Sequence, residues 1–307
     1  MLKNQLFGVE VEMTGITREK AASIIAEVLG TTASRPDDTC YETHIIADQA
    51  DRKWKVMRDS SITPIRNDGG SASMDKYRVE FVTPPLEYKD IELLQNIIRK
   101  LRENGAKSHS SCGIHIHVDG ANHNASSLRR LVNFMTSRQD LIYEALEIGN
   151  REEHWCHKLN SSLLTEMKKD KNLSKEKIEQ IWYSSANDGY SGGVSHYHYN
   201  STRYHGVNLH SFFSKGTIEF RLFNSTLHAG KIKAYIQFCL AVSAWAITSK
   251  DKIVFRSMSD YTTKQKVTIM RNILTRRLGL YGDEFKTCRL HLMTPLKKAA
   301  GMTRRAA

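Results

Sequence analysis

The pattern of hydrophobic and polar positions predicts short strands that alternate with amphipathic helices. The segment LFGVEVEM at residues 6–13 has apolar side chains at every second position, which is typical of a half-buried strand. Apolar residues at helical spacing follow it, and Gly30 then marks the expected end of a helix. Three more short extended segments come next, and these are THIIAD, KWKVMRD and YRVEFVTPPL.

The remaining segments continue this alternation. We expect a helix at 90–104, a longer helix at 127–149, a charged helix at 174–182, a mobile loop at 184–206, a β-hairpin at 205–224 with its turn at Lys215–Gly216, and an apolar core helix at 229–248. Strands that pair locally between amphipathic helices indicate an α+β fold, with a mostly antiparallel sheet and helices packed on its apolar face.

Four of the predicted strands have a face that bears ligand-type side chains. In CGIHIHVDG, residues 112–120, the two histidines point to one face and the isoleucines to the other. An ordinary solvent-facing surface explains any single strand of this kind, but such a surface also favours Lys and Thr. Four strands therefore favour a shared site, formed by Glu10, Glu12, Glu80, His115, His117, Glu219 and Arg221.

The residue types at this shared site suggest the kind of ligand. Carboxylate oxygens with an imidazole suit Mg²⁺ or Mn²⁺, and clustered carboxylates repel one another unless cations lie among them. Arg221 and Arg203 would then face the negative charge of a phosphate, so a metal-bound nucleotide is expected. The sequence has no P-loop and no Rossmann glycine motif. Ser191 in GYSGG lacks the flanking strand and helix that a nucleophile elbow requires.

Composition limits the class of protein. With 307 residues, 40% hydrophobic and 25% charged, the chain is long enough for one large domain or two ordinary ones. Its five cysteines include no C-x-x-C pair, which favours a reducing compartment over a disulfide framework. The N-terminal residues lack a signal-peptide core, and the longest apolar stretch, 236–248, is too short to cross a bilayer. We therefore expect a cytoplasmic protein without a membrane partner.

A net charge of +12 leaves a second class of function open. This charge would suit a polyanionic partner, so a non-enzymatic nucleic-acid or assembly protein is an alternative hypothesis. Part of the excess lies after Lys286, where a basic terminus can simply aid solubility. A polyanion binder has no need for carboxylates at strand midpoints, so we do not expect nucleic acid as the partner.

Six segments, in order, resemble the amidoligase family, which is related to glutamine synthetase and glutamate–cysteine ligase. They are FGVEVE, DSSI, VEFVTPPL, CGIHIHV, RYHGVNL and GTIEFRLFN, within residues 6–248. The resemblance implies a glutamine synthetase-like catalytic domain over residues 1–250, in which the concave face of a curved sheet holds ATP and two or three Mg²⁺ ions. Residues 251–307 are expected to form a basic helical extension and tail on the same domain.

The resemblance also implies a metal-ligand set. Glu10, His115 and Glu219 would hold the cation between the nucleotide phosphates. Glu12 and Glu80 would hold the cation nearer the carboxylate substrate. The second set has few carboxylates, so water or substrate would complete its coordination shell.

Other residues take nucleotide-binding and catalytic roles by the same resemblance. His117 and Asn208 would contact the nucleotide, while Arg203 and Arg221 would stabilise both the transferring phosphoryl group and the carboxylate. Asp59 matches an Asp-Gly-Ser segment of the family, although the sequence here reads Asp-Ser-Ser.

The activity implied is an ATP-dependent carboxylate–amine ligase that forms an amide through an acyl phosphate. Its substrates would be ATP, a carboxylate and an amine from an amino acid, peptide or protein. The general base is not identified, and Tyr197, His198 and His205 are candidates by position alone. A phosphotransferase on the same scaffold is the closest alternative, because it would need the same residues with a different acceptor pocket.

Overall fold

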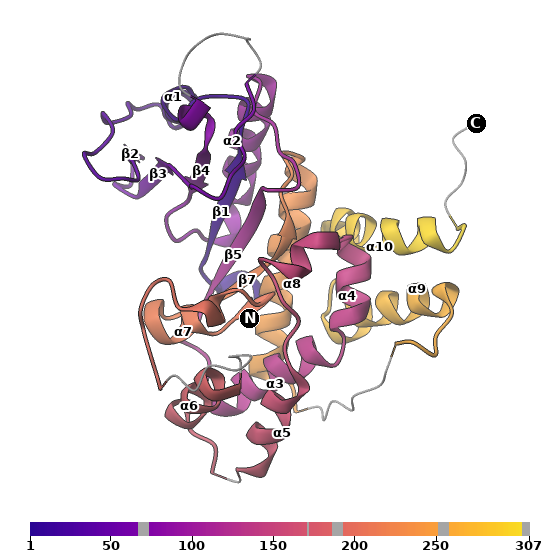
Figure 1. Ribbon diagram of the computed structural model, residues 1–307. Helices are drawn as coiled ribbons and strands as arrows, with labels where there is room; N and C mark the ends of the chain where they lie inside the picture. The colour runs from indigo at the N-terminus through magenta and orange to yellow at the C-terminus, as the bar shows by residue number, and fades with distance from the viewer. Residues whose placement is uncertain (67–73, 171, 186–192, 251–257, 303–307) are drawn as a thin grey trace. The chain divides into compact units, whose positions relative to one another are not determined.

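The protein has an α+β fold built on a seven-stranded sheet, as a computed structural model shows (Figure 1). The structure describes residues 1–66, 74–170, 172–185, 193–250 and 258–302. The strand order is β2-β3-β4-β1-β5-β7-β6, and the pairs β2–β3, β3–β4, β4–β1 and β6–β7 are antiparallel. The predicted fold class and antiparallel sheet are thus confirmed.

The chain forms two compact units, each made of separate parts of the sequence. One consists of Lys3–Ile116 with Phe223–Ile236, and we call it the N-terminal unit. The other consists of Met1–Leu2, His117–Leu222 and Gln237–Ala307, and we call it the C-terminal unit. Strands β5 and β7 and helix α8 each contribute residues to both units. Each unit is described by itself below.

The N-terminal unit contains the strands and helices predicted for it. Helix α1 begins after Thr17, whose Oγ1 accepts a hydrogen bond from the backbone N–H of Lys20, and ends at Gly30 with a φ of 65°. It packs against β2, β3, β4 and α2 (Figure 1). The elements are β1 (Phe7–Met13), α1 (Arg18–Leu29), β2 (His44–Ala47), β3 (Lys53–Met57), β4 (Val79–Val82), α2 (Ile91–Glu103) and the start of β5 (Gly113–Asp119).

Alternation along β1 separates the core of this unit from a polar face. Val9, Val11 and Met13 are fully buried among apolar side chains, whereas Glu10 and Glu12 point to the opposite face. The same alternation in β4 buries Val79 and Phe81 and places Glu80 on the polar face. The sheet therefore presents carboxylates side by side.

The C-terminal unit is mostly helical. Its α8 is buried along nearly its whole length, as the apolar sequence predicted. The elements are α3 (Ala125–Thr136), α4 (Gln139–Leu146), α5 (Ser161–Lys169), α6 (Lys175–Ser185), β6 (Val207–Asn208), α7 (His210–Lys215), β7 (Thr217–Asn224), α8 (Ala229–Thr248), α9 (Thr263–Asn272) and α10 (Lys286–Ala299).

The single helix predicted at 127–149 is wrong, because the chain forms α3 and α4 instead. The break falls at Arg138, where φ is −133°, and the N–H of Arg138 bonds to the carbonyl of Met135 rather than one residue further back. Ser137 Oγ donates to Asn133 Oδ1 at 3.0 Å and helps to end α3. Neither glycine nor proline marks the break, and the apolar spacing continues across it.

The β-hairpin predicted at 205–224 is only partly correct. Strands β6 and β7 do pair, but the first is two residues long and helix α7 joins them. Gly216, expected in the hairpin turn, instead ends α7 with a φ of 76°. Part of the predicted mobile loop, residues 186–192 with Ser191, lies outside the described residues.

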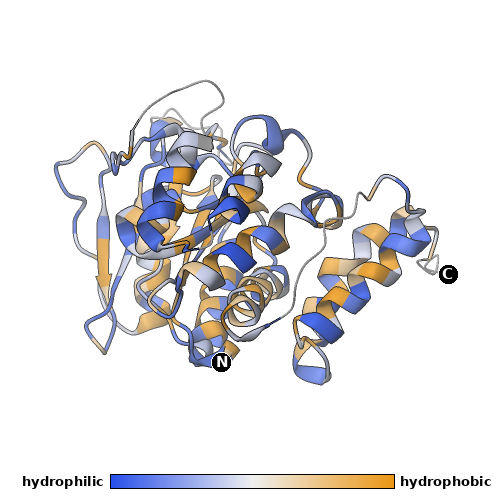
Figure 2. Ribbon diagram, turned by 90° about the horizontal axis from the view of Figure 1, so that it is seen from below, coloured by the Kyte–Doolittle hydropathy of each residue, from blue (hydrophilic) through white to orange (hydrophobic). Residues whose placement is uncertain are grey.

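The C-terminal helices pack on the C-terminal unit through their apolar faces. Helix α10 contacts α9 and α4, and Leu292 and Leu296 are buried. Figure 2 shows hydrophobic and hydrophilic residues on different faces of the two helices beside the C-terminus. Within the described ranges, none of the helices has the length and apolar character needed to cross a membrane.

Candidate functional site

Two carboxylates lie directly opposite each other on neighbouring strands of the N-terminal unit. The antiparallel register of β1 and β4 pairs Glu12 with Glu80, and Glu10 with Val82. Glu12 is 4% exposed and Glu80 is half-buried. Like charges at directly opposed positions destabilise a sheet, more so where water is partly excluded. This pair therefore indicates a site in which positive charge is needed.

Strand β5 brings an imidazole to the same two strands. His115 is 2% exposed, and its Nδ1 lies 2.8 Å from Oε2 of Glu10. Its Nε2 lies 3.6 Å from Oε1 of Glu12. With a proton on Nδ1, His115 donates to Glu10 and directs the lone pair of Nε2 toward Glu12. A carboxylate that orients a histidine in this way is a common arrangement around bound metals.

Glu12, Glu80 and His115 could together hold a metal ion. One potential ligand atom from each residue lies within 4.8 Å of the other two. Two carboxylates with one imidazole suit Mg²⁺ or Mn²⁺, which prefer oxygen donors and retain bound water. The residues present therefore fit a divalent cation. We refer to Glu10, Glu12, Glu80 and His115 as the acidic cluster.

Three predicted site residues come together in the C-terminal unit. Asn208 on β6 stands opposite Glu219 on β7, and its Nδ2 donates to Oε2 of Glu219 at 2.6 Å. Arg221 Nη1 donates to Oε1 of the same carboxylate at 2.9 Å. All three side chains are buried. Both oxygens of Glu219 are thus held in fixed positions by its neighbours.

An aromatic ring lies between the two arginines predicted to contact phosphate. The guanidinium groups of Arg203 and Arg221 each lie 5.6 Å from the centre of the Tyr204 ring. Such contacts are favourable because the face of an aromatic ring carries negative charge. The ring of Trp155 packs edge-on against Tyr204 at 5.8 Å. We call Arg203, Tyr204 and Arg221 the arginine–tyrosine stack.

His117 is held by hydroxyl groups of its own unit. Its Nδ1 lies 2.9 Å from Oγ1 of Thr217 and 3.4 Å from Oγ of Ser211. These two hydroxyl groups also bond to each other at 2.9 Å. The ring orientation is therefore fixed, as a phosphate contact would require.

The remaining candidate residues differ in their surroundings. Asp59 Oδ1 accepts the backbone N–H of Ser61 at 2.7 Å, which fixes a local turn. His205 is buried, bonds through Nδ1 to the carbonyl of Thr202 at 2.9 Å and packs against Trp182. These contacts point to a structural role for His205. Tyr197 is exposed.

Sequence reasoning missed several polar residues beside the site. His210 begins α7, and its Nδ1 lies 2.7 Å from the hydroxyl of Tyr183. Burial lowers the pKa of His210 to about 4, with Arg203 adding to the effect, and burial raises the pKa of Tyr183 to about 12. Both groups are therefore neutral at pH 7. Tyr204 and Arg151 were also missed, because nothing in their local sequence marks them as buried or stacked.

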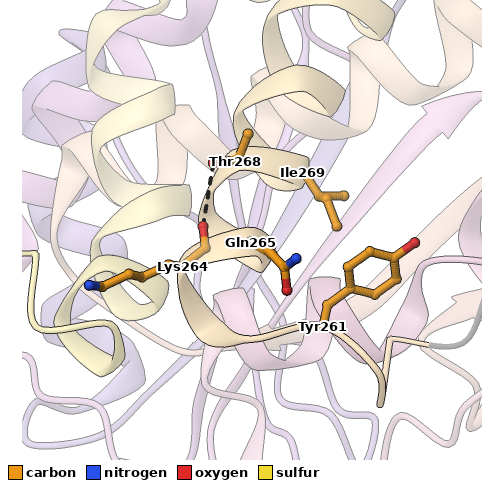
Figure 3. Close-up of a pocket in the computed structure, with 5 residues that line it drawn as sticks. All are labelled: Tyr261, Lys264, Gln265, Thr268 and Ile269. Carbon is orange, nitrogen blue, oxygen red and sulfur yellow. Dashed lines mark hydrogen bonds between the residues drawn. The ribbon is translucent and has the colours of Figure 1, made fainter.

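A hollow on helix α9 offers no comparable chemistry (Figure 3). It is lined by Tyr261, Lys264, Gln265, Thr268 and Ile269. Gln265 already forms the N-terminal capping box of α9 with Thr262, and Thr268 Oγ1 donates to the carbonyl of Lys264 at 3.4 Å. These five residues thus serve the helix and its surface.

Comparison with known proteins agrees with this acidic and basic site. The model of the family described as "putative amidoligase enzyme" matches residues 3–243, which is most of the chain. The chain therefore belongs to this family, and the resemblance seen in its motifs is confirmed. No curated protein matches the chain. Family membership assigns the protein to the ligases that form amide bonds.

Proposed function

We propose that the protein is an ATP- and Mg²⁺-dependent carboxylate–amine ligase that forms an amide or isopeptide bond through an acyl phosphate. The observation that carries the proposal is the opposed pair Glu12 and Glu80 with His115 beside it. A chain of the amidoligase family that buries two like charges side by side has a use for a divalent cation at that point.

We assign two cation-binding groups. Glu12 and Glu80, with Nε2 of His115, would hold one cation through the contacts of the acidic cluster. Glu10 and Glu219 would serve a second, as the family resemblance implies, and β5 separates their strands in the sheet order. When bound, such cations offset the charge of the two anions that must meet in the reaction.

The basic residues would act on the nucleotide and the carboxylate. Arg221, fixed by Glu219 and Tyr204, is placed to donate to a phosphoryl oxygen without a large loss of side-chain entropy. Arg203 would act on the same group through the arginine–tyrosine stack. His117 and Asn208 would contribute further hydrogen bonds to the nucleotide.

The proposed chemistry has two balanced steps. An oxygen of the substrate carboxylate attacks the γ-phosphorus of ATP, the bond to the β-phosphate oxygen breaks, and ADP leaves. The amine nitrogen then attacks the carbonyl carbon of the acyl phosphate, inorganic phosphate leaves, and the amine gives up one proton. Fixed arginines stabilise the negative charge that develops in both steps.

The test traps the intermediate, so the natural amine need not be known. The protein is incubated with ATP, Mg²⁺, hydroxylamine and pools of amino acids, γ-glutamyl compounds or peptides. We expect a hydroxamate with equal release of phosphate, because hydroxylamine intercepts acyl phosphates. Arg221→Ala and Glu80→Gln should each lower the rate by at least about 100-fold.

A matched control and a contrary outcome make this test decisive. Glu92→Gln changes an exposed carboxylate on α2 and should leave the rate unchanged. Consumption of ATP with a stable phosphorylated product and no hydroxamate would replace the ligase with the phosphotransferase alternative.

A further inference from the structure

Arg151 is a buried arginine whose charge is not matched by the protein. It lies in the short 3-10 helix Gly149–Glu153 and is 5% exposed. Its Nε is buried without a hydrogen-bond partner, and none of the acidic side chains in the described ranges forms an ion pair with it. Burying a guanidinium group without compensation is costly, so its position calls for a reason other than stability.

Arg18 shows how this chain normally treats a buried arginine. Arg18 is 3% exposed, and its Nη1 donates to the carbonyls of Asp75 and Arg78 at 2.6 and 3.2 Å. Its Nη2 pairs with the carboxylate of Glu42. Two arginines of equal burial thus differ in one respect, which is the supply of acceptors. A ligand can provide for Arg151 what the protein provides for Arg18.

The local backbone carries Arg151 toward the arginine–tyrosine stack. The carbonyl of Arg151 accepts the backbone N–H groups of Trp155 at 2.9 Å and Cys156 at 3.1 Å, which closes a tight turn. The carbonyl of Trp155 then accepts Nε of Arg221 at 3.4 Å. The chain therefore connects the two arginines through a single turn.

A second set of bonds fixes this turn beside β7. The N–H of Gly206 donates to the carbonyl of His157 at 3.0 Å, and the carbonyl of Gly206 accepts the N–H of Arg221 at 2.9 Å. Both Arg151 and Arg221 also act electrostatically on the Cys156 thiol, whose pKa burial nevertheless raises to about 11. Two guanidinium groups thus approach the same buried sulfur atom.

We propose that Arg151 and Arg221 form one oxyanion-binding subsite, which takes a phosphoryl or carboxylate group of the substrates. The proposal rests on the proposed function and adds to it a third arginine, which the sequence did not reveal. Two guanidinium groups suit an oxyanion because each can donate two parallel hydrogen bonds. Tyr204 and Glu219 hold Arg221 in place, and the turn at Trp155 holds Arg151.

The test compares two matched variants without ATP or Mg²⁺. Arg151→Met removes the unmatched charge, so the thermal midpoint of the free protein should stay level or rise. Arg18→Met removes a matched charge and should lower the midpoint. The probes are pyrophosphate and glutarate, each added at constant ionic strength adjusted with NaCl. We expect at least one probe to raise the wild-type midpoint, with about tenfold or weaker binding in Arg151→Met.

The pattern of loss identifies the ligand. Weaker binding of pyrophosphate alone assigns the subsite to the phosphoryl group, and weaker binding of glutarate alone assigns it to the carboxylate. Arg151→Lys keeps the charge without the planar geometry and should bind the same probe with intermediate affinity. This variant decides the question if Arg151→Met does not fold.

Two results would overturn the proposal. One is a wild-type midpoint that neither probe raises. The other is equal binding by wild type and both Arg151 variants. Because neither ATP nor metal is present, failure here is distinct from failure of the hydroxamate test, which depends on both.

Discussion

The backbone N–H of Gly113 donates a 2.6 Å hydrogen bond to Oε2 of Glu12. This contact, between the start of β5 and the middle of β1, fixes one carboxylate oxygen and leaves the other facing His115 at 3.6 Å. The ionised carboxylate is thus held at a defined orientation before any ligand binds. A site prepared in this way loses little entropy on binding a cation.

Two substitutions of Glu12 should separate its structural role from its charge. In Glu12→Gln, the amide oxygen can still accept from Gly113, so the free energy of unfolding should stay within about 1 kcal/mol of wild type. In Glu12→Ala, the buried N–H of Gly113 loses its acceptor, and a loss of about 1–3 kcal/mol is expected. Urea unfolding of both variants measures the difference. Equal stability of the two would contradict the role given to Gly113.

Removal of one carboxylate should abolish stabilisation by metal. Mg²⁺ or Mn²⁺ at about 100 times its dissociation constant should stabilise the folded protein by about 2.7 kcal/mol, because it binds the folded state alone. Glu80→Gln should lose this increment and remain folded, while Glu92→Gln should keep it. Thermal unfolding with and without metal provides the measurement. An unchanged increment in Glu80→Gln would remove Glu80 from the ligand set.

A buried histidine outside the site should make stability depend on pH. Burial lowers the pKa of His123 from 6.5 to about 4, and its ring nitrogens lie 3.1 and 2.8 Å from the hydroxyls of Ser127 and Ser243. Between these pH values the unfolded chain binds a proton that the folded protein does not. Stability should therefore be constant above pH 6.5 and fall by about 3 kcal/mol as the pH drops to 4.

The control for this pH effect is His123→Gln. Glutamine does not titrate, so urea unfolding of this variant should show a shallower decline between pH 6.5 and pH 4 than the wild type shows. A parallel decline in both proteins would assign the effect to other groups.

A methyl group at Gly206 should clash with one particular hydroxyl. A Cβ atom there would lie 2.1 Å from the Tyr143 hydroxyl, which donates to the carbonyl of Cys156 at 2.8 Å. Gly206→Ala should destabilise the protein by about 1–3 kcal/mol. Adding Tyr143→Phe removes the clashing oxygen and should recover part of this loss. A double variant less stable than the sum of the single variants would refute the clash.

The positive charge gives a test of the alternative hypothesis. A protein built to bind nucleic acid should bind a generic duplex tightly, with an affinity that falls steeply with salt. We expect weak binding that Arg221→Ala does not alter. Tight binding that disappears on removal of residues 297–307 would favour the polyanion-binding class.

Alternation was the strongest guide to the acidic cluster. In β1 and β5 every second side chain is apolar and buried, so the opposite faces of these strands were correctly predicted from the sequence. The register between strands was not predictable, because it depends on contacts between distant segments. The pairing of Glu12 with Glu80 is known only from the structure.

Short helices and buried charges escaped prediction for a different reason. The residues of α7 include two aromatic side chains that also suit a strand, and tertiary packing decided between the two conformations. Arg151 lies in a charged segment, NREEHW, which suggests an exposed surface. Its burial results from the turn that returns to Trp155 and Cys156, and no local pattern encodes such a turn.

The division of the chain into discontinuous units has a consequence for its synthesis. Residues 223–236 complete the N-terminal unit, so that unit cannot finish folding until more than two thirds of the chain has left the ribosome. Helix α8, which contributes to both units, must emerge before either is complete. The nascent chain thus keeps partly formed strands exposed for much of translation, and early termination before this helix yields neither unit intact.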